Sequence, residues 1–274
     1  MWEGLSVQFD PILAVMGECG RHLADIGASE GAAGNISVLL PATTIAPREF
    51  DQQTVSPTPI ACPNLVGRTI LVTGSGTRLR EIHLDPYANL ACLEILPGGR
   101  EMRVRTSERR LFERPTSELN THLAIHERFG SESPESPHTV IHAQPLYLTY
   151  LSHISRYQET SYLNRHIMRW QAETMIFVPE GIGVLPFLLP GSSQLQAATL
   201  SQMEDHRVVL WGKHGVIARS SHSIKKATDL IEYLETGARY EYLNLSNHGL
   251  ADGLTSAEIK AVCAAHGLHP SWLS

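Results

Sequence analysis

The residues most able to do chemistry in this chain are His142, at the end of an apolar run, and Gln144, two positions later. Alternate side chains of a strand point to the same face, so residues 142 and 144 are expected to face the same way. Two histidines there would hold a divalent cation, but the second position carries an amide. His214, in a turn, could supply a third ligand. The alternative for His142 is a hydrogen-bonded core histidine, and spacing alone does not decide.

A second candidate is a row of ionisable residues, Glu118, His122 and His126, which recur every four positions and so share one helix face. This row could hold a metal ion, or it could be an ordinary polar face. A different interpretation places Glu118 in the first turn of the helix, behind Thr116 and Ser117. Backbone N–H groups and hydroxyls there could bind an anion, and the carboxylate could act as a base. The sequence leaves these alternatives open.

Three turns of small residues form a third candidate, an anion site made of Gly34-Asn35, Thr73-Gly74-Ser75-Gly76 and Thr116-Ser117. Glycine lets backbone N–H groups approach a phosphate closely, and Ser, Thr and Asn add donors without bulk. The standard nucleotide motifs are absent, because Leu79 stands where a dinucleotide fingerprint requires its third glycine and no Gly-Lys-Ser/Thr loop occurs. Nucleotide binding by either motif is therefore not expected.

Composition excludes several classes of protein. The chain has 274 residues, 42% hydrophobic, and a formal net charge of -6, which argues against general binding to nucleic acid or an anionic membrane. The apolar runs are shorter than the ~20 residues of a membrane span, and the start lacks an export signal. We expect a cytoplasmic protein whose thiols are reduced and mostly buried, since its cysteines form no C-x-x-C pair: Cys19, Cys62, Cys92 and Cys263.

Helical and extended patterns alternate along the chain and must position these candidates. Strands are expected over residues 35–40, 69–73, 91–95, 100–106, 139–144, 175–178, 208–211 and 216–218. Helices are expected over residues 11–25 with Asp10 as N-cap, 115–129, 145–153, 193–206, 222–243 and 255–266. Residues 41–63, rich in proline, are expected to be a loop or an edge, and residues 131–137 a loop. Without repeats or a linker, this pattern predicts one layered α/β domain over residues 1–274.

The order of several short motifs adds a resemblance. They are Gly34-Asn35-Ile36-Ser37, Val72-Thr73-Gly74-Ser75-Gly76, Leu84-Asp85-Pro86-Tyr87-Ala88-Asn89-Leu90, Pro115-Thr116-Ser117-Glu118-Leu119, Val140-Ile141-His142, Pro179-Glu180-Gly181-Ile182-Gly183, Leu185-Pro186, Pro190-Gly191, Val209-Leu210-Trp211 and His214-Gly215-Val216. In this order they resemble the rhamnulose-1-phosphate aldolase family, within the class II aldolase/adducin superfamily. The N-terminal segment 1–30 and the part beyond Leu245 carry less of the likeness. The resemblance implies a three-layer α/β/α domain with a central mixed, largely antiparallel sheet.

The resemblance also implies a function and a set of roles. Such aldolases cleave a ketose 1-phosphate, for instance rhamnulose 1-phosphate, to dihydroxyacetone phosphate and an aldehyde such as lactaldehyde. A Zn²⁺ ion on three histidines stabilises the enediolate. His142 and His214 match the first and third ligands, Glu118 matches the glutamate that moves protons on the three-carbon fragment, and Glu173 matches a second catalytic glutamate. His122 and His126 match no ligand. The phosphate would lie among Gly34, Asn35, Ser75, Gly76, Thr116 and Ser117, and a homotetramer is expected.

Gln144 departs from the family pattern, which has its middle histidine there. Three outcomes follow: a weakened zinc site completed by Glu118 or water, a site that takes Mn²⁺ or Mg²⁺ because these ions accept oxygen ligands, or no metal. The last would make the chain a catalytically silent sugar-phosphate-binding or assembly protein on the same fold. The superfamily also includes epimerases and dehydratases acting on sugar phosphates, which remain a further alternative.

Overall fold

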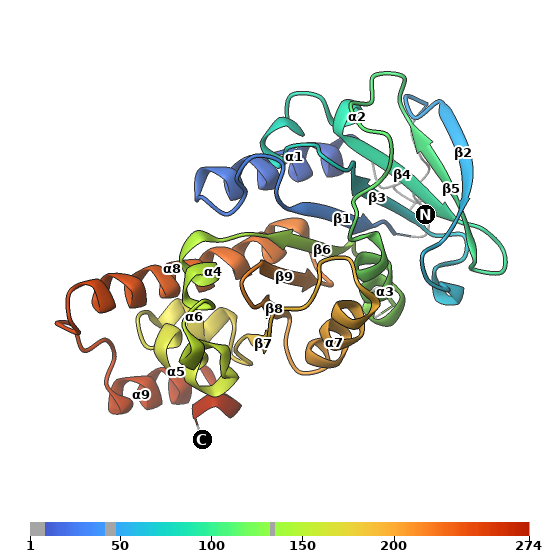
Figure 1. Ribbon diagram of the computed structural model, residues 1–274. Coiled ribbons are helices and arrows are strands. Elements are labelled where there is room, and N and C mark those ends of the chain that lie inside the picture. Colours follow the sequence, from blue (N-terminus) through green and yellow to red (C-terminus); the bar gives the residue numbers. More distant parts are fainter. Residues whose placement is uncertain (1–8, 42–47, 132–134, 274) are drawn as a thin grey trace, which may run out of the picture.

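A nine-stranded sheet is the centre of the molecule, with the strand order β2-β5-β4-β3-β1-β6-β9-β8-β7. The computed structural model describes residues 9–41, 48–131 and 135–273 (Figure 1). Every neighbouring pair is antiparallel except β7 and β8, which are parallel. The predicted mixed, largely antiparallel sheet is confirmed. The strands are β1 (Asn35–Leu39), β2 (Gln52–Pro57), β3 (Thr69–Thr73), β4 (Leu90–Ile95), β5 (Glu101–Thr106), β6 (His138–Ala143), β7 (Gly183–Leu185), β8 (Val208–Trp211) and β9 (Gly215–Ser220).

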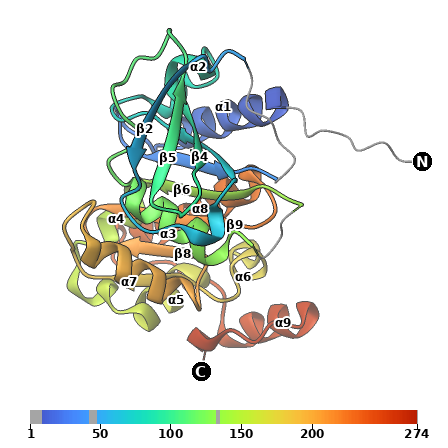
Figure 2. The same ribbon diagram turned by 90° about the vertical axis from the view of Figure 1, so that its right-hand side faces the viewer.

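Helices cover both faces of the sheet. They are α1 (Phe9–Asp25), α2 (Pro86–Asn89), α3 (Leu119–Phe129), α4 (Leu146–Leu151), α5 (Thr160–Met168), α6 (Ala172–Phe177), α7 (Ser193–Met203), α8 (Ile224–Ser246) and α9 (Ser256–His266). Alternation along β6 separates two cores. Ile141 packs with α1 and α8 residues, and Val140 packs with α3 and α7 residues on the other face. Figure 2 shows α9 at the opposite end of the molecule from β2.

Four expectations are corrected by the structure. Residues 175–178 form no strand, because Met175 belongs to α6, where it is buried against the core. Asp10 lies inside α1, which begins at Phe9, so it does not cap that helix. The helix expected from Pro115 begins at Leu119, with Glu118 at its N-cap, because Pro115 pairs with Gly74 in an isolated bridge. The strand with His142 ends at Ala143, so Gln144 follows it.

Other expectations hold with small shifts in their ends. Residues 41–63 contain the short edge strand β2, whose side chains are mostly exposed. α9 begins after Thr255, whose hydroxyl and backbone form a reciprocal capping box with Glu258. All four cysteines are buried free thiols, as expected. The chain start, with its expected lack of an export signal, lies outside the described residues, as do residues 42–47 and 132–134 of the two expected loops. Among the helices that are described, none has the length and apolar character needed to cross a membrane.

β1 is the strand that brings the candidate residues together. It lies between β3 and β6, and its first residue, Asn35, is directly opposite His142. Because the neighbours run antiparallel to β1, the start of β1 and the ends of β3 and β6 meet at one edge of the sheet. The turn between β8 and β9, which carries His214, lies at the same edge since β9 pairs with β6.

Candidate active site

A cavity of about 220 Å³ opens at this edge of the sheet. It is lined by Ala32, Gly34, Asn35, Gly74, Ser75, Gly76, Thr116, Ser117, Glu118, His142, Gln144, Pro190 and His214. Every residue to which the family resemblance assigned metal or phosphate binding is among them, as is the catalytic candidate Glu118. A larger cavity, of about 570 Å³, lies at the start of α8 and contains none of these residues.

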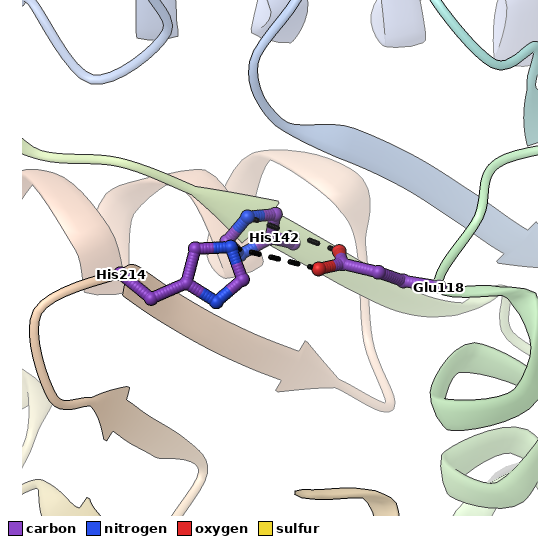
Figure 3. Close-up of side chains that lie close together, drawn as sticks. All are labelled: Glu118, His142 and His214. Atoms are coloured by element: carbon purple, nitrogen blue, oxygen red, sulfur yellow. Dashed lines mark ion pairs between the residues drawn. The ribbon is translucent and has the colours of Figure 1, made fainter. Parts of the chain in front are cut away.

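Three side chains converge inside the cavity from different elements. Glu118 points from the start of α3 toward His142 on β6 and His214 in the turn before β9 (Figure 3). Its Oε2 is 3.8 Å from His142 Nε2, and its Oε1 is 3.7 Å from His214 Nε2. One donor atom of each residue lies within 4.8 Å of the others. Among the described residues, this is the group whose atoms could hold a metal ion.

His142 turns its second ring nitrogen toward this group. Its Nδ1 lies 2.8 Å from the backbone oxygen of Val216, so Nδ1 carries a proton, and Nε2 faces Glu118. This arrangement, with one ring nitrogen donating to a carbonyl and the other free, is common in metal-bound histidines. The ring stacks on Trp211, with centroids 4.9 Å apart. The residues present therefore fit a divalent cation.

A strained turn places His214. Lys213, the residue before it, has a φ of 62°, in the left-handed region that residues other than glycine rarely adopt. The Lys213 N–H donates to Ser152 Oγ, which holds the turn in place. Burial, together with the nearby His142 ring, lowers the pKa of His214 to about 4, so the imidazole is neutral near pH 7. A neutral ring is the form that binds metal.

Glu118 is buried but ionised. Burial raises the pKa of its carboxyl, but attraction to His142 and a hydrogen bond from Asn35 outweigh that effect and hold the pKa below its ordinary value. Asn35 Nδ2 donates to Glu118 Oε2 at 2.9 Å. The backbone N–H of Glu118 donates to Thr116 Oγ1. An ionised carboxylate held between an amide donor and two imidazoles can accept a proton from a bound molecule.

Gln144 lies beside His142 on the cavity wall. A Cβ added at Gly215 would be 3.0 Å from both Gln144 Cγ and His142 Cε1, so the two side chains flank that glycine. The backbone N–H of Gln144 donates to the Ala28 oxygen, which fixes its position after β6. Within the described part of the chain, the Gln144 amide side chain makes no hydrogen bond, and it is free to turn its oxygen into the cavity.

The small-residue turns form the rest of the wall. Gly34 has a φ of 85°, and a Cβ there would come within 3.0 Å of the His142 oxygen, so only glycine fits. Gly76, at a φ of 82°, ends the second turn. Across the described residues, the backbone N–H groups of Gly76 and Ser117 have no hydrogen-bond acceptor. The three turns that were separate in the sequence share one wall, as an anion site would require.

Two outcomes differ from the sequence-based interpretation. Glu173 is exposed on α6 and is not among the residues that line the cavity, so the structure does not bring it to Glu118. His122 and His126 are fully buried and hydrogen-bonded to Ser37, so these two histidines neither face solvent nor belong to the metal-binding group. Sequence reasoning missed the contacts of Ser37 and His138 with this row. The only signal was the alternation of Asn35 and Ser37 along one strand.

Comparison with known proteins agrees with this geometry. Residues 14–242 match the family model described as "Class II Aldolase and Adducin N-terminal domain". Rhamnulose-1-phosphate aldolase of Listeria monocytogenes is 26% identical over 257 residues, 92% of each chain. The enzyme of the same name from Yersinia pestis is 30% identical over 250 residues, 89% of each.

Solved structures lead to the same family. A sugar-phosphate aldolase from Thermotoga maritima superimposes with a TM-score of 0.72 at 31% identity, covering 87% of this chain and 96% of that one. An L-fuculose 1-phosphate aldolase, at 20% identity and a TM-score of 0.59 over 96% of this chain and 99% of that chain, shares the fold. With the family model covering most of its length, this chain belongs to the class II aldolase/adducin family.

Proposed function

We propose that this protein is a metal-dependent aldolase that cleaves a ketose 1-phosphate to dihydroxyacetone phosphate and an aldehyde. The substrate we favour is rhamnulose 1-phosphate, whose aldehyde product is lactaldehyde. The observation that carries the proposal is the convergence of Glu118, His142 and His214 in a cavity that also contains three anion-suited turns. The names of the relatives support a sugar phosphate as the substrate class.

The phosphate of the substrate would bind on the wall formed by the small-residue turns. The N–H groups of Gly76 and Ser117 and the hydroxyls of Ser75, Thr116 and Ser117 supply donors. The N-terminus of α3, an 11-residue helix, adds a positive partial charge beside them. Gly34 and Asn35 complete the wall next to Glu118. A small anion is thus held within reach of the carboxylate.

Glu118 is the group we assign to proton transfer. In the direction of condensation, its carboxylate removes one proton from carbon 3 of dihydroxyacetone phosphate, and the electron pair moves toward the C2 oxygen to give an enediolate. Cleavage runs in reverse: the C4 hydroxyl gives its proton to solvent and becomes the aldehyde oxygen as the C3–C4 bond breaks, the pair stays on the three-carbon fragment, and Glu118 returns the proton to C3. A bound divalent cation would supply Lewis-acid stabilisation of the negative charge.

His142 and His214 are the ligands we propose for that cation, with the Gln144 amide oxygen beside them as the third. Imidazole nitrogens suit Zn²⁺, whereas an amide oxygen suits Mn²⁺ or Mg²⁺ better. Glu118 is close enough to both rings to approach a cation when substrate is absent. Zinc is our first choice because two of the three groups are imidazoles.

Measuring bound metal together with cleavage tests the proposal. Purified protein is analysed for metal, and rhamnulose 1-phosphate cleavage is then followed with and without added Zn²⁺, Mn²⁺ or Mg²⁺. We expect a bound divalent cation and release of dihydroxyacetone phosphate. Protein that stays metal-free and inactive after each addition would instead be a silent sugar-phosphate-binding or assembly protein. A product with its carbon chain intact would indicate an epimerase or dehydratase.

The proposal extends to assembly and location. Glu173 lies outside the cavity of its own subunit, so a catalytic role for it requires a neighbouring subunit. A homotetramer with sites near subunit interfaces, as the family resemblance implies, would meet that requirement. Sedimentation of the purified protein would test the homotetramer. We also propose a cytoplasmic location, in line with reduced, buried cysteines.

A further inference from the structure

A continuous series of hydrogen bonds leads from Glu118 away from the cavity and into the protein. It begins where Asn35 Nδ2 donates to Glu118 Oε2 at 2.9 Å. The other end of the same amide, Asn35 Oδ1, lies 2.5 Å from His122 Nε2. On its far side, His122 Nδ1 lies 2.6 Å from Ser37 Oγ. We call this series, with its continuation below, the interior chain.

The interior chain continues through two more histidines. Ser37 Oγ lies 2.8 Å from His126 Nε2, and His126 Nδ1 lies 2.7 Å from His138 Nδ1. His138 is at the start of β6, four residues before His142, which is roughly 13 Å along a strand. Ser37 and all three histidines are at most 1% exposed.

Regular spacing on three elements makes the interior chain possible. Asn35 and Ser37 are two apart on β1 and face the same side of the sheet. Glu118, at the N-cap of α3, and His122 and His126, within it, are four apart and share one helix side, which packs over that face. The row that spacing alone nominated as a metal site is therefore matched, bond by bond, to polar residues of β1.

The Asn35 amide fixes the direction of every bond. Its Nδ2 donates to Glu118 Oε2, so its Oδ1, which only accepts, must accept from His122 Nε2–H. The neutral His122 ring then accepts from the Ser37 hydroxyl at Nδ1. Ser37 Oγ accepts from His126 Nε2–H, and His126 Nδ1 accepts from His138 Nδ1–H. In each of these five hydrogen bonds, the donated hydrogen points toward the Glu118 end of the interior chain.

Burial favours the neutral form of the three interior-chain histidines. Burial lowers the pKa of His122 to about 4 and that of His138 to about 3. The pKa of His126 is lowered as well, by burial and by the neighbouring His138. Each ring therefore has one N–H and one lone pair near pH 7, as the assigned direction requires. His138 Nε2, the far end, has no hydrogen-bond partner among the residues that the structure describes, and it is the unprotonated nitrogen in this assignment.

From this geometry we infer that Ser37, His122, His126 and His138 are positioning residues that act through Asn35 to fix the carboxylate of Glu118. Burying a polar side chain costs free energy unless it is hydrogen-bonded. The interior chain bonds both ends of the Asn35 amide, so the amide cannot turn over without breaking two hydrogen bonds. The Glu118 Oε2 is held by Asn35, while Oε1 stays directed at His214. The inference rests on the proposed role of Glu118 as the base.

The interior chain orients the carboxylate and does not conduct protons to it. The Asn35 amide donates from one atom and accepts at another, and a neutral amide does not pass a proton between them. Protons would have to cross Asn35 to reach Glu118 along this route. Breaking the interior chain should therefore slow proton transfer at the substrate and leave the affinity for substrate unchanged.

The first test reads the interior chain without using activity. Nitrogen NMR of histidine-labelled full-length protein, metal-free and loaded with zinc, should find His122 and His126 protonated at Nε2 and His138 at Nδ1. The Asn35 side-chain N–H should be shifted downfield and protected from exchange, since it donates to a carboxylate. Single substitutions assign the signals. Protonation of His122 or His126 at Nδ1 overturns the assigned direction and with it the inference.

The second test breaks the interior chain at its centre. Ser37→Ala removes one hydroxyl and little volume. Thr121→Val is the matched control, because Thr121 is a buried α3 residue whose hydroxyl bonds to no group in the described part of the chain. Ser37→Ala should lower kcat roughly 10- to 100-fold, the range for residues that orient a site from outside, with KM changed less than about twofold. It should also lose the downfield Asn35 signal. Thr121→Val should leave both unchanged.

The third test separates a positioning role from a merely structural one. His138→Leu removes the last donor, whereas His138→Asn keeps an N–H donor near the place of Nδ1. If both fold, His138→Asn should retain the Asn35 signal and most of kcat that His138→Leu loses. Equal effects of the two at equal stability contradict the inference.

The outcomes also distinguish the two proposals. A wild-type protein that has the expected NMR pattern but no activity contradicts the proposed aldolase function. The interior chain is then tested by the Asn35 signal of Ser37→Ala alone. An active enzyme whose kcat is unchanged by Ser37→Ala overturns the positioning role alone.

Discussion

Two groups of histidines lie on the same side of the sheet and differ in what their ring nitrogens contact. The cavity histidines are His142 and His214, and the interior histidines are His122, His126 and His138. His142 has one nitrogen on a backbone oxygen and the other facing Glu118 across 3.8 Å. His126 has both nitrogens bonded inside the protein, to Ser37 and His138. A ring with a free lone pair can bind metal, and a ring with both nitrogens occupied can only hold its neighbours.

The difference shows why spacing alone does not identify a metal ligand. The row of Glu118, His122 and His126 has regular helical spacing, yet only Glu118, at the cavity end, reaches a group that could hold a cation. The cavity histidines come from a strand and a distant turn. Glu118 belongs to both groups, since it faces the cavity histidines and accepts from the interior chain through Asn35.

The largest expected effect removes the charge that both groups share. Glu118→Gln keeps an oxygen that can accept from Asn35 but cannot take a proton, so kcat for cleavage should fall about 10²- to 10⁴-fold. The mutant should also fail to exchange the C3 proton of dihydroxyacetone phosphate in D₂O, measured by proton NMR. Glu127→Gln, on the same helix with its carboxylate on the Asn64 N–H, is the control. Wild-type exchange by Glu118→Gln would remove the assigned base.

The next effect sharpens the cavity side of the comparison. Gln144→His adds a third imidazole beside His142 and should tighten Zn²⁺ binding by at least about 10- to 100-fold. That is the range for substitutions of residues that only contact metal ligands, and a direct ligand should matter at least as much. Competition with a chromophoric chelator measures the affinity. Gln194→His, on an exposed face of α7, should leave it unchanged. An unaltered affinity in Gln144→His would mean that position 144 does not reach the cation.

The interior histidines should make stability depend on pH. The pKa of His138 is about 3 in the folded protein and about 6.5 when unfolded. Between these values the unfolded state binds more protons, so the free energy of unfolding falls as pH drops below 6.5, by roughly 1.4 kcal/mol per pH unit for this residue. Urea unfolding at several pH values between 7 and 4.5 measures the slope.

Comparing wild type with His138→Asn isolates that contribution. Glu235 acts in the opposite direction, because burial raises its pKa to about 7 and the folded state then binds the extra proton. Both proteins share this effect, so it cancels in the difference between their slopes. The wild-type slope should be steeper by about 1.4 kcal/mol per pH unit. Equal slopes would show that His138 is protonated in the folded protein.

The smallest effect concerns the turn that positions His214. Lys213→Gly relieves the left-handed backbone at φ 62° and should raise the free energy of unfolding by about 0.5 to 1 kcal/mol. His248→Gly, at φ 58° on an exposed turn far along the chain, should give a similar gain. Only Lys213→Gly should weaken metal binding, because it loosens the residue next to His214. Equal metal affinities in both variants would show that the turn does not orient the ligand.

Much of the fold could be predicted because local patterns and tertiary contacts agree. β3 spans the predicted residues 69–73, and β8 the predicted 208–211, since both are short apolar runs ended by turns. The prediction failed at Met175, because a short apolar run is compatible with either a strand or a buried helix. The brief β7, three residues long, has too few positions to show a period.

The candidate site could be predicted only in part for a related reason. His142, His214 and the small-residue turns were nominated correctly as neighbours, because their order matched a family pattern. The partners of His122 and His126 could not be found, because they depend on the register of β1 beneath α3. Burial decides whether such a row of polar residues on a helix faces solvent or forms hydrogen bonds inside the protein. The spacing of the residues does not show whether they are buried.

The register of β1 against β6 has a consequence for the order in which the molecule acquires its site. Asn35 and Glu118 are 83 positions apart in sequence, and Asn35 faces His142 only when the two strands pair in register. Contacts of such long sequence separation form slowly during folding. A one-residue slip would turn Asn35 and Ser37 to the opposite face of the sheet. A refolding chain should therefore gain helical structure first, and its ability to capture a metal ion should appear only in the last phase.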